Sequence, residues 1–229
     1  DLSWQVVLQK ITDDPILIDK EINFAFFSDK LEKMETYTGI DSVVNAVKNG
    51  SYMGSSKEQA VSCVLKAIEN FPNDKESKIF KTFTDESLQN VSLQMIFDLE
   101  KMCLEKNINT KFYFINKDKK LMEFSVWEIK KLTEKAIFDG VKGVFNNFIK
   151  NQRNRGDLNK KEKVENNEKI NKLITYFNDC EFEKFFNDPL TAEMFKNSHE
   201  IRKDPFSHFS KKVIPSVSLE GYCRVIDLD

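Results

Sequence analysis

Glycine and histidine are scarce in this sequence, and their scarcity excludes several kinds of functional site. Of the 229 residues, 7 are Gly and 2 are His. The chain has no Gly-rich phosphate loop of the GxxxxGK(S/T) or GxGxxG type and no HExxH pair. Two histidines also cannot build a multi-histidine metal site. We therefore predict no metal and no cofactor, and the lack of catalytic motifs favours a protein that is not an enzyme.

Long apolar runs and a surplus of charge of one sign are also missing. A membrane-spanning helix needs roughly 18 consecutive apolar residues, and no run in the sequence approaches that length. The 35 Lys and Arg side chains nearly balance the 37 Asp and Glu, which gives a formal net charge of -2. Such a chain has no long-range field for nucleic acid, so nucleic acid is disfavoured as a partner, although a local basic patch is compatible with this balance.

Cysteine is present but never in a paired spacing. The four cysteines are Cys63, Cys103, Cys180 and Cys223. Because they lie far apart, zinc-ribbon and thioredoxin-like motifs are excluded, and we expect free thiols in a reducing, cytoplasmic compartment. The alternative is a secreted protein with disulfides, since the cysteine count is even and glycosylation sequons occur at residues 49–51 and 90–92. The chain starts at Asp1, so we expect its native N-terminus and any targeting signal to lie outside this sequence.

Phenylalanine and helical periodicity dominate what is present. The chain has 20 Phe, so planar apolar rings supply much of the core volume. Apolar residues recur at helical spacing in five segments, over about residues 15–34, 40–49, 57–71, 88–103 and 126–148. Asp14-Pro15 is a start signal for the first segment, and capping boxes at Ser56 and Ser125 begin the third and fifth. The sequence therefore predicts a mainly α fold, either a multi-helical bundle or an irregular helical array.

One segment departs from the helical period. Consecutive aromatic and β-branched residues followed by a polar turn and a second apolar run predict one short β-hairpin over about residues 111–124. Gly140 and Gly143 weaken the helix that follows, where we expect a bend or a break. Residues 151–172 contain few apolar side chains, which indicates a charged loop or an exposed helix. We expect a main helical body over residues 1–150 and a smaller C-terminal helical lobe over 173–229, or one continuous domain.

A short motif near the C-terminus resembles a catalytic motif. Arg202 and His208 are spaced like the Arg-(four to six residues)-His motif of HEPN-type ribonucleases, which are small all-helical domains. The resemblance covers seven residues and implies metal-free RNA cleavage, in which the imidazole takes a 2′-hydroxyl proton and the guanidinium holds the phosphate. The sequence departs from that family at Lys203, where a polar Asn, His or Asp is usual, and Pro205 predicts a break in the helix.

A non-enzymatic interaction domain is the function that these observations favour. We expect a regulatory or protein-binding domain that holds another protein in an apolar groove between helices. The alternative is a metal-free HEPN-like ribonuclease that uses Arg202 and His208. The basic stretch over residues 150–172 has no interleaved aromatic side chains, which argues against a binding surface for single-stranded nucleic acid.

Overall fold

The chain folds into two compact units that we describe separately. The computed structural model describes residues 2–13, 20–49, 59–74 and 76–220. Of these residues, 56% are helical and 19% lie in strands. The sheet unit comprises Asp1–Val91, Met95–Ile129 and Pro215–Asp229, and the helical unit comprises Ser92–Gln94 and Lys130–Ile214.

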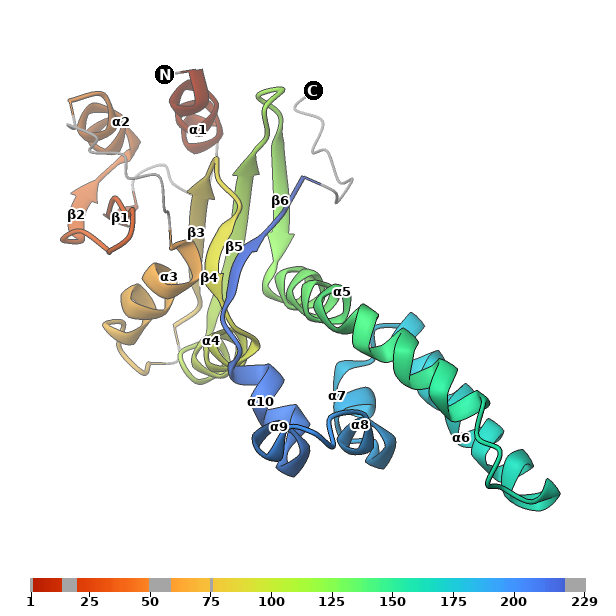
Figure 1. Cartoon of the computed structure of the whole chain (residues 1–229). Helices are drawn as coiled ribbons and strands as arrows, with labels where there is room; N and C mark the ends of the chain where they lie inside the picture. Colours follow the sequence, from red (N-terminus) through yellow and green to blue (C-terminus); the bar gives the residue numbers. More distant parts are fainter. Residues whose placement is uncertain (1, 14–19, 50–58, 75, 221–229) are drawn as a thin grey trace. The chain divides into compact units, whose positions relative to one another are not determined.

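The sheet unit combines helices with three small sheets (Figure 1). Its helices are α1 (Leu2–Thr12), α2 (Ile40–Asn49), α3 (Ala60–Glu69) and most of α4 (Leu93–Glu105). Its strands are β1 (Glu21–Phe24), β2 (Glu35–Thr38), β3 (Lys78–Thr84), β4 (Leu88–Val91), β5 (Ile108–Ile115), β6 (Leu121–Ser125) and β7 (Ile214–Val217). Strand β1 pairs with β2, strand β4 pairs with β7, and β3, β5 and β6 form a mixed sheet in that order.

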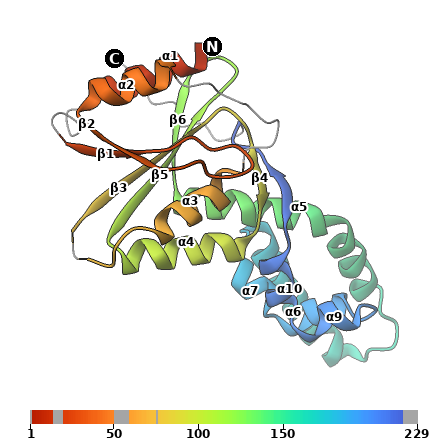
Figure 2. The same cartoon turned by 90° about the vertical axis from the view of Figure 1, so that its left-hand side faces the viewer.

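The mixed sheet has one buried face and one partly exposed face (Figure 2). Strand β3 is parallel to β5, and β5 is antiparallel to β6. Side chains alternate between the faces along each strand. One face carries the buried rings of Phe112, Phe114 and Phe124. The opposite face, which we call the outer face, carries Lys111 and Glu123, both partly exposed.

Helix α1 covers one end of the outer face. The buried cluster at this contact consists of Val7, Ile11, Tyr113, Ile115 and Leu121. Isolated helices of this length are marginal in water, so α1 depends on burying its apolar side against the sheet. Each buried aliphatic side chain contributes about 1.5–3 kcal/mol relative to an exposed one.

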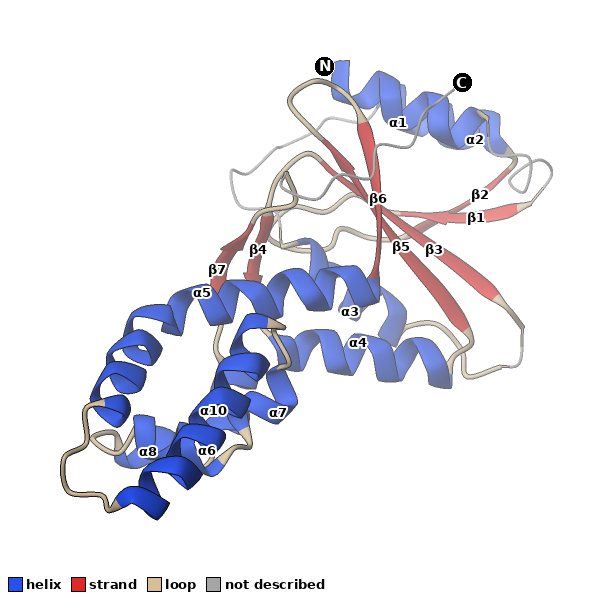
Figure 3. Ribbon diagram, turned by 90° about the vertical axis from the view of Figure 1, so that its right-hand side faces the viewer, coloured by secondary structure: helices blue, strands red, loops and turns tan. Residues whose placement is uncertain are grey.

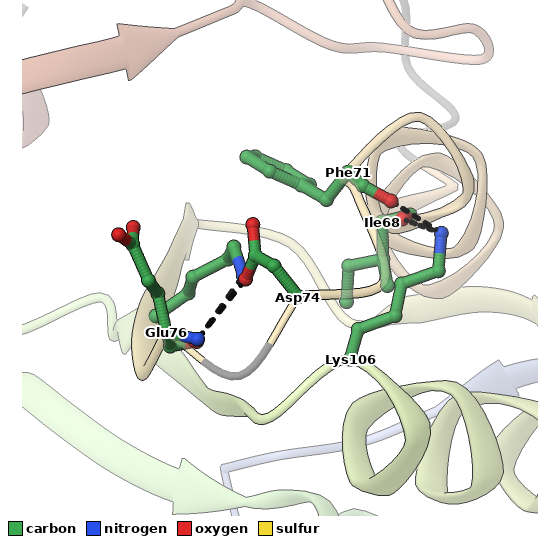
Figure 4. A network of polar contacts seen from close by, with 6 residues as sticks. Ile68, Phe71, Asp74, Glu76 and Lys106 are labelled. Atoms are coloured by element: carbon green, nitrogen blue, oxygen red, sulfur yellow. Dashed lines mark hydrogen bonds and ion pairs between the residues drawn. The ribbon is translucent and has the colours of Figure 1, made fainter.

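Lys106 closes the C-terminal end of α3 (Figure 4). Its ammonium donates hydrogen bonds to the carbonyl oxygens of Ile68, Glu69 and Phe71, at 2.9, 2.8 and 2.7 Å. The last carbonyls of a helix lack partners within it, and the Ile68 oxygen also accepts from the Phe71 amide (3.0 Å). A positive charge also suits the negative end of the helix dipole. Because Lys106 directly follows the last residue of α4, the three bonds tie the ends of α3 and α4 together.

The helical unit is built around phenylalanine rings. Its helices are the greater part of α5 (Val126–Arg153), α6 (Lys160–Asn178), α7 (Phe182–Phe186), α8 (Pro189–Met194), α9 (His199–Lys203) and α10 (Pro205–Lys211). Helices α5 and α6 lie antiparallel (Figure 3). The Phe145 and Phe177 rings stack between them with a centroid distance of 4.1 Å. Edge-on and tilted contacts among Phe138, Phe185 and Phe186 extend this core.

The mixture of helix and sheet shows that the predicted mainly α fold with one hairpin is wrong. The hairpin predicted over residues 111–124 is present as β5 and β6, but β3 extends it in parallel and two further strand pairs exist. The helix predicted over residues 15–34 is replaced from Glu21 by the antiparallel pair β1–β2, and residues 14–19 lie outside the described residues. Strand β1 alternates polar and apolar residues, and this strand period overrides the helical spacing of Ile22 and Phe26.

The start of α4 is also corrected. Leu88 and Val91 belong to β4 rather than to the predicted helix over residues 88–103. Asn90 between them adopts a φ of 51°, a left-handed conformation that a right-handed helix excludes. The helix therefore begins only at Leu93.

Several helix boundaries are confirmed. Helix α2 ends at Asn49 as predicted. Ser125 and Glu128 form the predicted capping box, in which the Ser125 amide donates to Glu128 Oε2 (2.7 Å) and the Glu128 amide donates to Ser125 Oγ (3.2 Å). The predicted capping box at Ser56 lies outside the described residues. Helix α5 continues through Gly140 and Gly143, so the expected break is absent.

Candidate functional site

The β1–β2 ribbon and its connecting turn carry a partly exposed apolar surface. In the register of the ribbon, Ile22 pairs with Tyr37 and Phe24 pairs with Glu35. The large apolar side chains of this segment are all half-buried; they are Ile22, Phe24, Phe26, Phe27, Leu31, Met34 and Tyr37. We call these seven side chains the ribbon surface. Amphipathic ribbons usually bury their apolar side in a core, and the seven side chains of this segment gather in one stretch of the chain without any of them being fully buried.

Backbone contacts hold the ribbon at both ends. Near the turn, the Ser28 carbonyl oxygen accepts a hydrogen bond from the Gln59 amide at the start of α3 (2.8 Å). At the base, the Gly39 amide donates to the Lys20 carbonyl oxygen (3.1 Å), and the φ of 75° at Gly39 permits the turn into α2. Figures 1 and 2 show the ribbon between α2 and α3. The ribbon surface is therefore presented by an anchored segment.

Ring contacts and a polar opposite side define the two faces of the ribbon. The Phe24 ring makes edge-on contacts with Phe26 and Tyr37, at centroid distances of 4.9 and 6.4 Å. On the other side, Thr36 Oγ1 donates to Asn23 Oδ1 (2.8 Å). One side of the ribbon thus carries the apolar side chains together with Glu35, and the opposite side is polar.

The rim of the ribbon surface is more acidic than basic. The exposed charged residues from Lys20 to Asp41 are Lys20, Glu21, Asp29, Lys30, Glu32, Lys33, Glu35 and Asp41. The Tyr37 hydroxyl donates a hydrogen bond to the Glu35 carboxylate (2.6 Å), and this bond raises the pKa of Tyr37 above its ordinary 10.0.

A second cluster of polar side chains lies on the outer face of the mixed sheet. Glu123 forms an ion pair with Lys111, the Phe83 and Tyr113 rings stack at 4.9 Å, and the Lys10 ammonium lies 5.9 Å from the Tyr113 ring. Burial raises the pKa of Glu123, but hydrogen bonds from Lys111 and Tyr113, together with the charges of Lys111 and Lys10, outweigh it and lower the pKa below its usual value. The cluster pairs its own charges, which indicates a structural role.

Arg202 and His208, the residues that resemble the HEPN motif, lie on two different helices. Arg202 is exposed on α9, with its guanidinium 3.5 Å from His199 Nδ1. His208 is half-buried on α10, and its ring lies edge-on to Phe209 at 5.0 Å. Asp204 separates the helices with an extended φ of -154°, and its side chain caps α10 by accepting from the Ser207 amide.

The ribonuclease interpretation stays a prediction that one assay tests. Cleavage of labelled RNA by the wild-type chain that is lost in His208→Ala, with circular dichroism unchanged, would support it. No cleavage by the wild-type chain would remove it.

Comparisons with known proteins were made at the level of families, sequences and structures. No family model, curated protein or solved structure matches the chain. Functional inference therefore depends on the chemistry of the described surfaces.

The described residues hold neither a membrane-spanning helix nor a cluster of metal ligands. None of the described helices is long and apolar enough to cross a bilayer. Within residues 2–13, 20–49, 59–74 and 76–220, no group of three or more His, Cys, Asp and Glu side chains could hold a metal ion. Cys63, Cys103 and Cys180 are free thiols, and Cys223 lies outside the described residues.

The sequence pattern did not reveal the ribbon surface. We predicted a docking groove between helices, and Ile22, Phe26 and Leu31 were assigned to the apolar side of a helix. The signals that could have located the ribbon are the alternation of polar with apolar residues at Glu21–Phe24 and the Thr and Tyr residues of Glu35–Thr38, which favour strands.

Proposed function

We propose that this chain is a non-enzymatic protein-interaction module that binds a protein partner on the ribbon surface. The observation that carries the proposal is that all seven large apolar side chains from Ile22 to Tyr37 are half-buried and none is fully buried. Aromatic and Met side chains are enriched where proteins meet, because they bury a large area with few polar atoms. A partner that covers the ribbon surface would complete the burial of these side chains.

The partner that fits best is an extended segment in which apolar residues alternate with Lys or Arg. Among the described strands, β1 and β2 pair only with each other, so each offers an outer edge to which a segment can add by main-chain hydrogen bonds. The rim supplies the charge preference, because five of its eight charged side chains are acidic. Complementary charge fixes the register of a partner and raises its association rate.

A peptide selection on the full chain tests this proposal. Random peptides displayed on phage are selected for binding, and we expect the enriched peptides to alternate apolar and basic residues. Phe24→Ser removes a central ring and should weaken a selected peptide by about tenfold or more, as loss of a hot-spot aromatic does. Thr36→Ala changes the opposite side of the ribbon and is the matched control, which should bind within about twofold of the wild type.

Two outcomes would overturn the proposal. One is enrichment of peptides without the alternating pattern, or of none. The other is a Phe24→Ser chain that binds a selected peptide as tightly as wild type. If Phe24→Ser unfolds the ribbon by circular dichroism, Tyr37→Ser on the same side provides the equivalent comparison.

A further inference from the structure

The end of the α5–α6 helical pair is strongly basic. From residue 150 to residue 163, six side chains are Lys or Arg and two are Asp or Glu. The exposed basic residues of this segment are Lys150, Arg153, Lys160, Lys161 and Lys163. They come from the last turn of α5 and the start of α6, which the loop over residues 154–159 connects (Figures 1 and 3). We call residues 150–163 the basic tip.

The two acidic side chains of the basic tip already have structural roles. The Asp157 carboxylate accepts two hydrogen bonds from the Arg155 guanidinium, from Nε at 3.2 Å and from Nη2 at 2.8 Å. This pairing lowers the pKa of Asp157. Glu162 accepts from the Asn159 amide (2.8 Å) in the capping box that begins α6. Both carboxylates therefore stabilise the tip itself. Lys161 also lies 4.0 Å from the Glu165 carboxylate in α6, just beyond the tip. The exposed basic side chains still outnumber the acidic ones in this segment.

The charge of the whole chain conceals this surface. The helical unit holds 18 Lys and Arg against 13 Asp and Glu, a net charge of +5, whereas the sheet unit holds 17 against 24, a net charge of -7. A polyanion at close range meets the field of the nearby charges rather than that of the total charge of -2. This is because salt screens charges that lie farther away than about 10 Å. The negative net charge of the whole chain therefore does not exclude binding of a polyanion at the basic tip.

The amino-acid composition of the basic tip favours one class of polyanion over the others. No aromatic side chain occurs from Ile149 to Thr175, so the surface cannot stack on the bases of a single strand. Leu158 is the only apolar residue of the basic tip, and Val164 directly follows it, which is too few to insert into a membrane. Side-chain amides of Asn151, Asn154 and Asn159 lie among the basic residues, and such amides commonly contact phosphate oxygens.

We propose that the basic tip binds the phosphate backbone of double-stranded nucleic acid without reading its sequence. This function is additional to partner binding at the ribbon surface and uses different residues. Each phosphate contact releases counterions from the duplex, so the affinity falls with salt by a slope of about 0.9 in logarithmic units per contact.

Fluorescence anisotropy with a labelled DNA duplex, read at increasing NaCl concentration, tests the proposal on the full chain. The triple variant Arg153→Gln, Lys160→Gln, Lys163→Gln should weaken binding and reduce the salt slope by about 2 to 3. The matched control is Lys48→Gln, Lys66→Gln, Lys101→Gln, which removes the same charge from exposed positions of the sheet unit. This control should keep the salt slope of the wild type.

Each alternative has its own outcome. Equal loss in both triple variants would show a bulk-charge effect and overturn the proposal. Tighter binding to a single strand than to the duplex would overturn the choice of ligand. Binding to phosphatidylserine vesicles without binding to the duplex would assign the tip to a membrane surface instead. Circular dichroism of both variants confirms that the exposed substitutions leave the fold intact.

Discussion

Glu123 shows how strongly one carboxylate can depend on its neighbours. Its lowered pKa stabilises the folded state at pH values above the usual glutamate pKa of 4.5, and this stabilisation is lost as the pH falls through the lower pKa of the folded state. We expect Glu123→Gln to reduce the free energy of unfolding at neutral pH by up to about 1 kcal/mol. The difference from wild type should shrink in acid, and urea unfolding at both pH values measures it.

Glu105→Gln is the control for this experiment. Glu105 is exposed on α4 and its carboxylate lies 3.9 Å from the Lys101 ammonium, a pair that contributes little in water. A pH-independent loss of stability in Glu123→Gln would show that packing, rather than the charge of Glu123, accounts for the effect.

At the scale of single elements, α5 contains glycines that its geometry does not require. A Cβ added at Gly140 or Gly143 would meet no atom within 4 Å, and neither residue has a positive φ. Glycine inside a helix costs about 0.5–1 kcal/mol relative to alanine, mostly through the entropy of the unfolded chain. We therefore expect Gly140→Ala with Gly143→Ala to raise the free energy of unfolding by about 1–2 kcal/mol, measured by thermal and urea unfolding.

We expect Gly39→Ala to have the opposite effect and to lower the free energy of unfolding. This glycine has a φ of 75°, where an alanine side chain is strained, so the substitution should destabilise the chain by about 1 kcal/mol despite open space around it. Stabilisation by Gly39→Ala, or loss of stability in the α5 double variant, would contradict the backbone argument.

The elements also show which parts of the fold the sequence could predict. Helices with clear boundary signals, such as α2 ending at Asn49 and α5 beginning after Ser125, were predicted because their capping chemistry is local. Strand β3 was not predicted, because it pairs with β5 in parallel and its neighbour lies beyond an intervening helix in the sequence. The ribbon was misassigned because four-residue spacing, as in Ile22 and Phe26, satisfies both periods.

The residues of the candidate sites could likewise be predicted only where a local sequence pattern marks them. Arg202 and His208 could be selected by spacing alone, yet Asp204 and Pro205 begin a new helix between them. The exposure of the ribbon surface depends on how completely α2 and α3 cover it, which is a tertiary property that periodicity does not encode.

At the scale of the whole molecule, positive and negative charge are distributed unequally between the two units. A protein with a sequence pI of about 5.9 and uniform charge should bind only an anion exchanger at neutral pH. We expect this chain to be retained on a cation exchanger as well at low salt, through the basic tip.

The triple variant of the basic tip should pass through the cation exchanger, whereas the control triple variant of the sheet unit should be retained. Equal retention of the two triple variants on the cation exchanger would show that the unequal charge of the two units does not determine how the chain binds a charged surface.

The phenylalanine core of the helical unit also determines how the molecule can be observed. Both tryptophans, Trp4 and Trp127, belong to the sheet unit, and the helical unit contains none. Selectively excited tryptophan emission therefore reports on the sheet unit alone. The melting of that unit can thus be followed in an unlabelled sample, without engineering a dye into the chain.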